Sequence, residues 1–419
     1  MEIGLIQYLA AGIFAAALLH TFAAKAFEKL AHRHPRHAGL FHLLGEVEVV
    51  FGFWAAVLIV AMALTVGGSP ALAYAESRNY TEPLFVFVVM VIAASRPVLT
   101  AVLRLVGVLA GWMPVRDATA RVWLSLALVP LAGSLITEPA AMTIAALMLG
   151  PQIFHKGTPE RLKYAALGVL FVNISIGGTL TSYAAPPVLM VASTWGWDSA
   201  FMLASFGWKS AVAVVINATL ATLLIKDFAQ RPDPGQTGDR PQAMPPLVIA
   251  IHLAFLAAVV VFAHHPVIFM GIFLFFIGYT QAYARSQSRL LIKEALLVAF
   301  FLAGLVVLGG MQQWWLQPIV SSLAPTALFI SALGLTAITD NAALTYLGSL
   351  IVGMSDQAKY MLVAGAVAGG GLTVIANAPN PAGVALLRGG FRDQSIGMGG
   401  LLIGALPPTA VAAGMLFFA

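Results

Sequence analysis

The sequence contains no cysteine and few charged residues. Because none of its 419 residues is Cys, disulfide frameworks, thiolate metal sites and thiol chemistry are excluded. Only 9% of the residues are charged, against roughly 25% in a soluble globular domain. The net charge of +5 lies mostly in short loops and does not indicate nucleic-acid binding. The sequence also lacks a P-loop and a nucleophile elbow, so neither an enzyme nor an ATP-driven pump is indicated, and no cofactor is expected.

Apolar residues make up 60% of the chain, and its mean hydropathy is +0.91. Apolar runs of spanning length, about 20 residues, recur from end to end, which is typical of an all-α polytopic membrane protein. We expect roughly ten transmembrane helices in a lipid bilayer, by class most compatible with a bacterial inner membrane. The clearest predicted spans are 3–24, 39–66, 83–107, 200–225, 246–263, 267–283, 294–310 and 395–417.

One polar linker, 226–245, divides the chain into halves 1–225 and 246–419. Two sequence matches relate the halves. SLITEPAAMT matches TAITDNAALT, pairing Glu138 with Asp340 at an offset of 202, and GGTLT matches GGGLT at an offset of 192. Ordered matches of this kind, in segments with interrupted helices, are typical of the repeats of secondary transporters.

The distribution of Lys and Arg predicts that the repeats have inverted topology. The positive-inside rule places the linker in the cytoplasm and both termini outside. Both ends of segment 122–154 are then cytoplasmic, so this segment must be a re-entrant hairpin, and hairpin 318–353 must enter from the opposite side. Each half then has three scaffold helices, a hairpin, an interrupted helix and a final helix. The interrupted helices are 164–193 and 360–387, and the final helices are 200–225 and 395–417.

Glu138 and Asp340 lie at the predicted hairpin turns. An unpaired carboxylate inside the membrane costs several kcal/mol, so it is neutralised by a proton, a cation or a basic partner. A purely structural carboxylate that ties helices together is the alternative. Thr137, Thr339 and Asn341 adjoin the two carboxylates and could supply neutral oxygen ligands.

The interrupted helices carry the second group of candidates. Gly and Pro clusters free backbone carbonyls, which membrane proteins tolerate only where these line a cavity. Oxygen atoms suit a hard cation such as Na⁺, whereas half-helix N-termini suit anions. The polar candidates in these segments are Asn173, Thr181, Thr373, Asn377 and Asn380, and Asp340, Asn341 and Asn377 are the expected Na⁺ ligands. Arg96, in the third span, either pairs with a carboxylate such as Glu138 or binds an anionic substrate.

With these motifs the chain resembles the ion transporter superfamily, and most closely its sodium/proton antiporter group, related to the NhaD type. The resemblance covers nearly the whole chain. It implies that Thr137-Glu138 and Thr339-Asp340-Asn341 are hairpin tips, that the segments 177–187 and 369–381 complete the site, and that the scaffold helices form a homodimer. Carboxylate-transporting relatives carry a Ser-Asn-Thr motif at the tips, and this sequence departs from that pattern.

Two acidic tips favour exchange of Na⁺ or Li⁺ for H⁺ by alternating access, because binding either ion neutralises the site. A transporter of organic anions or oxyanions, coupled to Na⁺ or H⁺, is the alternative. A membrane scaffold or sensor without transport activity is a third class, which the internal carboxylates disfavour.

Overall fold

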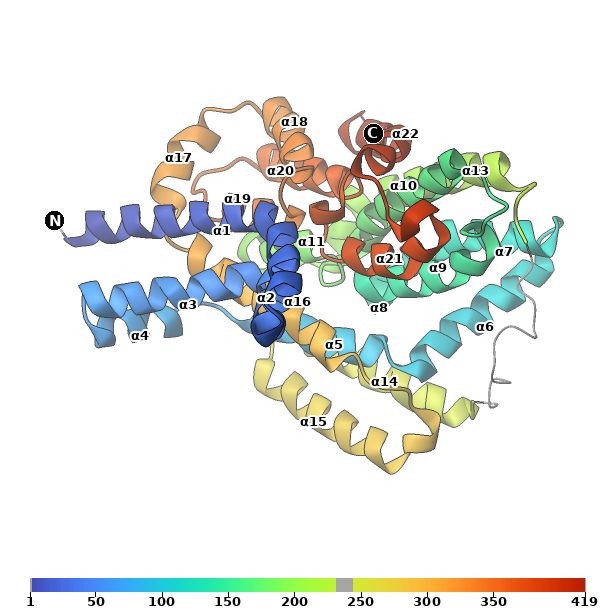
Figure 1. Ribbon diagram of the computed structural model, residues 1–419, viewed down its shortest axis with the longest axis horizontal. Coiled ribbons are helices and arrows are strands. Elements are labelled where there is room, and N and C mark those ends of the chain that lie inside the picture. Colours follow the sequence, from blue (N-terminus) through green and yellow to red (C-terminus); the bar gives the residue numbers. More distant parts are fainter. Residues whose placement is uncertain (1, 231–243, 419) are drawn as a thin grey trace. The chain divides into compact units, whose positions relative to one another are not determined.

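The computed structural model describes residues 2–230 and 244–418, and these residues form helices and connecting turns without strands (Figure 1). Residues 231–243, most of the predicted linker, lie outside the described residues. The chain forms two compact units. Unit 1 comprises 1–87, 292–323 and 346–355, and unit 2 comprises 88–291, 324–345 and 356–419.

Unit 1 is built around α3 and α16, two uninterrupted apolar helices. Their backbones approach closely where Gly304 faces Phe51 and Gly52, since a Cβ at Gly304 would collide with these residues. Small residues permit such close approach of helices in a membrane. The helices of this unit are α1 (Glu2–Arg33), α2 (Ala38–Gly45), α3 (Val47–Thr65), α4 (Gly68–Glu76), the first part of α5 (Thr81–Ala93), α16 (Ile292–Gly309) and α17 (Gln313–Ser321).

Unit 2 holds most of the remaining helices, and α10 is its central element. The apolar segment Glu160–Leu180, which contains α10, is 83% buried, which explains why nearly all of its side chains are apolar or small. The helices of this unit are α6 (Arg96–Trp112), α7 (Asp117–Leu126), α8 (Leu128–Ile136), α9 (Glu138–Ile153), α10 (Glu160–Gly177), α11 (Pro186–Trp195), α12 (Ser199–Met202), α13 (Trp208–Ile225), α14 (Pro246–Val261), α15 (Pro266–Ala282), α18 (Pro325–Thr336), α20 (Asp356–Gly369), α21 (Asn380–Leu387) and α22 (Met398–Phe418). The unit boundary falls within α19 (Asn341–Ser349), after Thr345.

Among the residues that the structure describes, six helices are long and apolar enough to cross a bilayer, or up to eight if each of two bent helix pairs is one span, by length and composition. The sequence predicted about ten. The difference arises partly because α14, α15 and α18 are apolar but shorter than a full span. The protein is therefore an all-helical integral membrane protein.

Two predicted spans are not continuous helices. Span 83–107 is divided into α5 and α6, which meet at a bend of 64°. Pro97 explains the break, because its ring excludes the carbonyl four residues earlier and it has no N–H to donate. Span 39–66 is divided into α2 and α3 by the extended backbone of Glu46 (φ −78°, ψ 118°), which follows Gly45, a weak helix former.

Candidate functional site

Both interrupted helices of unit 2 break at glycine, and each resumes at or directly beside a proline. α10 ends at Gly177, and α11 begins with Pro186, which needs no hydrogen-bond acceptor at a first helical turn. α20 ends at Gly369, and the chain is extended at Asn377 (φ −150°, ψ 139°) before α21 begins. Backbone groups that a continuous helix would pair internally are thus released at both breaks.

The two interrupted helices cross just before their breaks. Ser175 Oγ in α10 donates a 2.8 Å hydrogen bond to the carbonyl of Val367 in α20. Gly370 lies directly against the Ser175 side chain, and Gly371 against Val172, so that a Cβ at either glycine would collide. Glycine is therefore required at the start of the second break because another backbone passes there.

Glu138 joins the turn between α8 and α9 to both breaks. It follows Thr137, whose backbone is left-handed (φ 80°, ψ 150°), and its side chain is fully buried. Glu138 Oε2 accepts a 2.8 Å hydrogen bond from Asn377 Nδ2, in the second break. Glu138 Oε1 faces Gly178, in the first break, where an added Cβ would lie 2.6 Å from it. One carboxylate thus contacts elements of both halves of the chain.

Five buried oxygen atoms of the predicted site residues have no hydrogen-bond partner within the described ranges 2–230 and 244–418. Buried polar atoms are nearly always paired, so each of these unpaired oxygen atoms calls for an explanation. Every one of them can act as an acceptor, which is the property of a ligand for a hard cation. The five atoms are Thr137 Oγ1, Glu138 Oε1, Asn341 Oδ1, Asn377 Oδ1 and Asn380 Oδ1.

The orientation of two amides follows from their partners. Asn380 Nδ2 lies 2.8 Å from the carbonyl of Gly370 and 2.9 Å from that of Thr373, so only its NH₂ group can face them. Asn341 Nδ2 lies 3.4 Å from Ser175 Oγ, whose proton is already donated to Val367. Both amides must therefore donate through nitrogen, which leaves their oxygen atoms free.

Two threonines within the breaks fasten them to the neighbouring helices. Thr181 Oγ1 donates to the carbonyl of Ser134, at 2.6 Å, and Thr373 Oγ1 donates to that of Ala337, at 2.9 Å. Each hydroxyl proton is therefore used in a hydrogen bond to a backbone carbonyl, and each hydroxyl could meet a ligand only through its oxygen atom. Thr339 is half-buried in the turn before Asp340.

Asp340 has a local structural role that the sequence pattern did not reveal. Its Oδ1 accepts hydrogen bonds from the backbone N–H groups of Ala342, at 2.8 Å, and Ala343, at 3.3 Å, as an N-cap residue does. The side chain is half-buried rather than fully buried. α9 begins at Glu138, whereas α19 begins at Asn341, one residue after Asp340. The turn after α18 is also longer than the turn after α8.

Two predicted residues lie apart from this arrangement. Asn173 donates to the carbonyls of Leu126, at 2.8 Å, and Val214, at 3.2 Å, and accepts from Asn217, so its amide is fully used between helices. Arg96 forms no ion pair with Glu138 in the part of the chain that the structure describes, and the partner of Glu138 is Asn377. Of the two roles that the sequence left open for Arg96, pairing with Glu138 is therefore not observed among the described residues.

Sequence reasoning missed Ser134 and Ser175. Ser134 Oγ donates to the carbonyl of Gly177, at 2.7 Å, and accepts from the N–H of Leu180, at 2.9 Å, so it holds both sides of the first break. The positions of these two serines in the sequence were the signal that could have identified them. Ser134 precedes Glu138 by one helical turn, and Ser175 precedes a Gly-Gly pair in otherwise apolar sequence.

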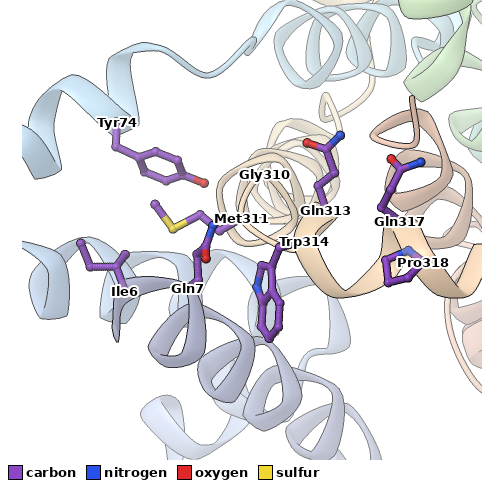
Figure 2. Close-up of a pocket in the computed structure, with 9 residues that line it drawn as sticks. All are labelled: Ile6, Gln7, Tyr74, Gly310, Met311, Gln313, Trp314, Gln317 and Pro318. Atoms are coloured by element: carbon purple, nitrogen blue, oxygen red, sulfur yellow. The ribbon is translucent and has the colours of Figure 1, made fainter. Parts of the chain in front are cut away.

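A cavity of about 630 Å³ in unit 1 has a different character. Figure 2 shows Tyr74, Gln7 and Met311 converging on it from separate elements. Its lining has no carboxylate and no basic side chain, and it includes none of the predicted site residues. It therefore offers no charged group to a cation or a proton.

The fold and the site define a polytopic membrane protein with a buried carboxylate between paired helix breaks, the class to which secondary transporters belong. The chain matches, over residues 5–419, the family model described as putative Na⁺/H⁺ antiporter, and it belongs to this family. A comparison with curated proteins gave no match. Membership assigns the chain at the coarse level to the cation/proton antiporters.

Proposed function

We propose that the protein exchanges Na⁺ or Li⁺ for H⁺ by alternating access, with Glu138 as the shared carrier of cation and proton. The observation that carries the proposal is the asymmetry of this carboxylate. Oε2 is held by Asn377, whereas the buried Oε1 has no hydrogen-bond partner among the described residues. One oxygen atom is thus fixed in position and the other is available to a ligand.

The coupling follows from the cost of a buried charge. A carboxylate without a counter-charge in the membrane is unfavourable by several kcal/mol. A proton on Oε1 removes the charge, and a cation beside Oε1 compensates it, with Asn377 Oδ1 as a further oxygen ligand. Because Oε1 serves both ligands, binding of one excludes the other. The protein then changes between its outward-facing and inward-facing states only when Glu138 carries a proton or a cation. This couples the two ions in exchange and prevents either ion from leaking alone.

Repeated contacts in the two halves support the inverted repeat that many alternating-access transporters have. The bonded pair Ser175 and Val367 is separated by 192 residues, which equals the offset between GGTLT and GGGLT. Gly177 approaches the carbonyl of Pro130 as Gly369 approaches that of Leu333, with an added Cβ 2.6 Å from each oxygen. Contacts between equivalent positions are expected where two repeats meet at a pseudo-two-fold axis.

Transport of an anion fits the site less well. An anion needs hydrogen-bond donors, whereas the five buried site atoms that have no hydrogen-bond partner among the described residues are all oxygens. The available atoms are oxygens, which would repel an anion. We therefore keep an organic-anion or oxyanion carrier only as an outcome of the test.

Purified protein in liposomes with an internal pH dye tests the proposal. Imposing a pH gradient and then adding Na⁺, Li⁺ or K⁺ should collapse the gradient with Na⁺ or Li⁺. In parallel, uptake of a radiolabelled dicarboxylate is measured. No response to any alkali cation, together with uptake of the anion, would overturn the assignment.

A further inference from the structure

A second cavity, of about 520 Å³, lies in unit 2 between two connecting segments. One segment joins α9 to α10, and the other follows α21. The residues that line the cavity are Lys156, Gly157, Thr158, Pro159, Glu160, Lys163, Gly389, Gly390, Phe391 and Arg392.

The walls of this cavity are held by specific contacts. The nearly buried Lys163 donates from Nζ to the carbonyl of Gly390, at 2.6 Å, and to Glu160 Oε1, at 3.0 Å. The ring of Phe391 packs against Phe154 and Tyr164, with centroids 5.7 and 4.9 Å apart. Gly390 lies so close to Phe154 that a Cβ would collide with its carbonyl. The two segments therefore form a shaped site and not a chance gap.

The charge of the site is positive. Segments 155–163 and 388–394 together carry five Lys or Arg residues and two carboxylates. Lys163 is neutralised by Glu160, but neither Lys156 nor Arg392 forms an ion pair with another residue of the described chain. The first turn of α10, a helix of 18 residues, also borders the cavity and adds the positive end of its dipole.

We propose that this cavity binds a phosphate-bearing anion through Lys156 and Arg392. The planar fork of Arg matches two phosphate oxygens, and Lys contributes a compact charge. Inorganic phosphate and the headgroup of an anionic phospholipid share this chemistry. The positive-inside rule predicts that these segments are cytoplasmic, where anionic lipids are concentrated.

The position of the cavity gives such an anion a mechanical consequence. α9 runs from Glu138 to Ile153, and α21 from Asn380 to Leu387, and the two helices pack together (Figure 1). Their first residues lie at the candidate cation site, and their last residues lead into the two segments around the cavity. A bound anion would link these segments at the ends remote from Glu138. The binding proposal itself does not depend on which ion the protein transports.

The test measures binding directly. Full-length protein in detergent is titrated with inorganic phosphate, and separately with phosphatidylglycerol or phosphatidylcholine, while the thermal midpoint and the bound lipid, by native mass spectrometry, are recorded. We expect saturable stabilisation by phosphate or phosphatidylglycerol and none by phosphatidylcholine. The double variant K156Q/R392Q should bind at least about tenfold more weakly, since two charge-assisted contacts are lost.

R285Q/R289Q is the matched control, because it removes the same charge from two exposed arginines that do not line the cavity. It should bind as the wild type does. The single variant K156Q provides a milder version if the double variant is unstable. A response to phosphate alone assigns a soluble anion, and a response to phosphatidylglycerol alone assigns a lipid. Full binding in K156Q/R392Q, or no binding to wild type, would overturn the proposal.

Discussion

Asn377 Nδ2 donates a 2.8 Å hydrogen bond to Glu138 Oε2 and so joins two residues that are 239 positions apart. The amide fixes one carboxylate oxygen and leaves the other against Gly178. A fully buried Glu side chain with a single neutral partner is costly to keep ionised. This arrangement therefore suits a group that is alternately protonated and paired with a cation, and it suits a permanent ion pair poorly.

Replacing Glu138 by Gln should abolish exchange without preventing folding. The amide is nearly isosteric and its oxygen can still accept from Asn377, but it can neither release a proton nor compensate a cation. We expect the Na⁺-dependent pH response to fall to the level of empty liposomes, with the thermal midpoint within a few degrees of wild type. Retained exchange in E138Q would remove Glu138 from the mechanism.

Replacing Gly178 by Ala tests whether space beside Glu138 Oε1 is needed. The new Cβ would lie 2.6 Å from Oε1, so the carboxylate must move and the ligand position is lost. We expect the apparent affinity for Na⁺ to fall at least about tenfold, which corresponds to roughly 1.4 kcal/mol. Gly107→Ala is the control, since nothing lies within 4 Å of a Cβ there and Ala is the better helix former. Equal Na⁺ affinity in the two variants would contradict this role of Gly178.

Asp340 variants separate its charge from its capping bonds. Asp340→Asn keeps an acceptor for the N–H groups of Ala342 and Ala343, whereas Asp340→Ala removes it and should cost about 1 kcal/mol of stability. If the charge contributes to cation binding, both variants should show weaker Na⁺ affinity, but only Asp340→Ala should lower the free energy of unfolding. Titrating exchange activity and measuring unfolding on the same samples distinguishes the two roles. Wild-type Na⁺ affinity in D340N would leave Asp340 with a capping role only.

The amino-acid pattern predicted the helical membrane class and the residue types of the candidate site. It did so because charges and Gly-Pro clusters are rare in apolar sequence and therefore stand out. The resemblance likewise anticipated the antiporter family, which the family match confirms.

Other features depend on contacts that spacing does not encode. The bond from Glu138 to Asn377 joins distant segments, and no local signal identifies that pair. The capping role of Asp340 depends on where α19 begins after the turn that follows α18, which side-chain identities do not determine. The role of Asn173 depended on which carbonyls of α7 and α13 lie beside it. The break at Pro97 could have been read locally, because proline within an expected span removes a backbone hydrogen bond and favours a kink or a break.

Asn173 and Asn377 should respond in opposite ways to replacement by Ala. Asn173 bonds to Leu126, Val214 and Asn217, so N173A leaves buried carbonyls unpaired and should destabilise the protein by about 1–3 kcal/mol while the Na⁺ affinity of the folded fraction is unchanged. Asn377 bonds to the carboxylate of Glu138, so N377A should weaken Na⁺ binding at least about tenfold. Chemical denaturation in detergent and Na⁺ titration of the pH response give the two quantities independently. If N173A lowers the Na⁺ affinity when the amounts of folded protein are equal, Asn173 belongs to the ion site after all. If N377A leaves the Na⁺ affinity unchanged, the hydrogen bond from Asn377 does not set the orientation of the Glu138 carboxylate.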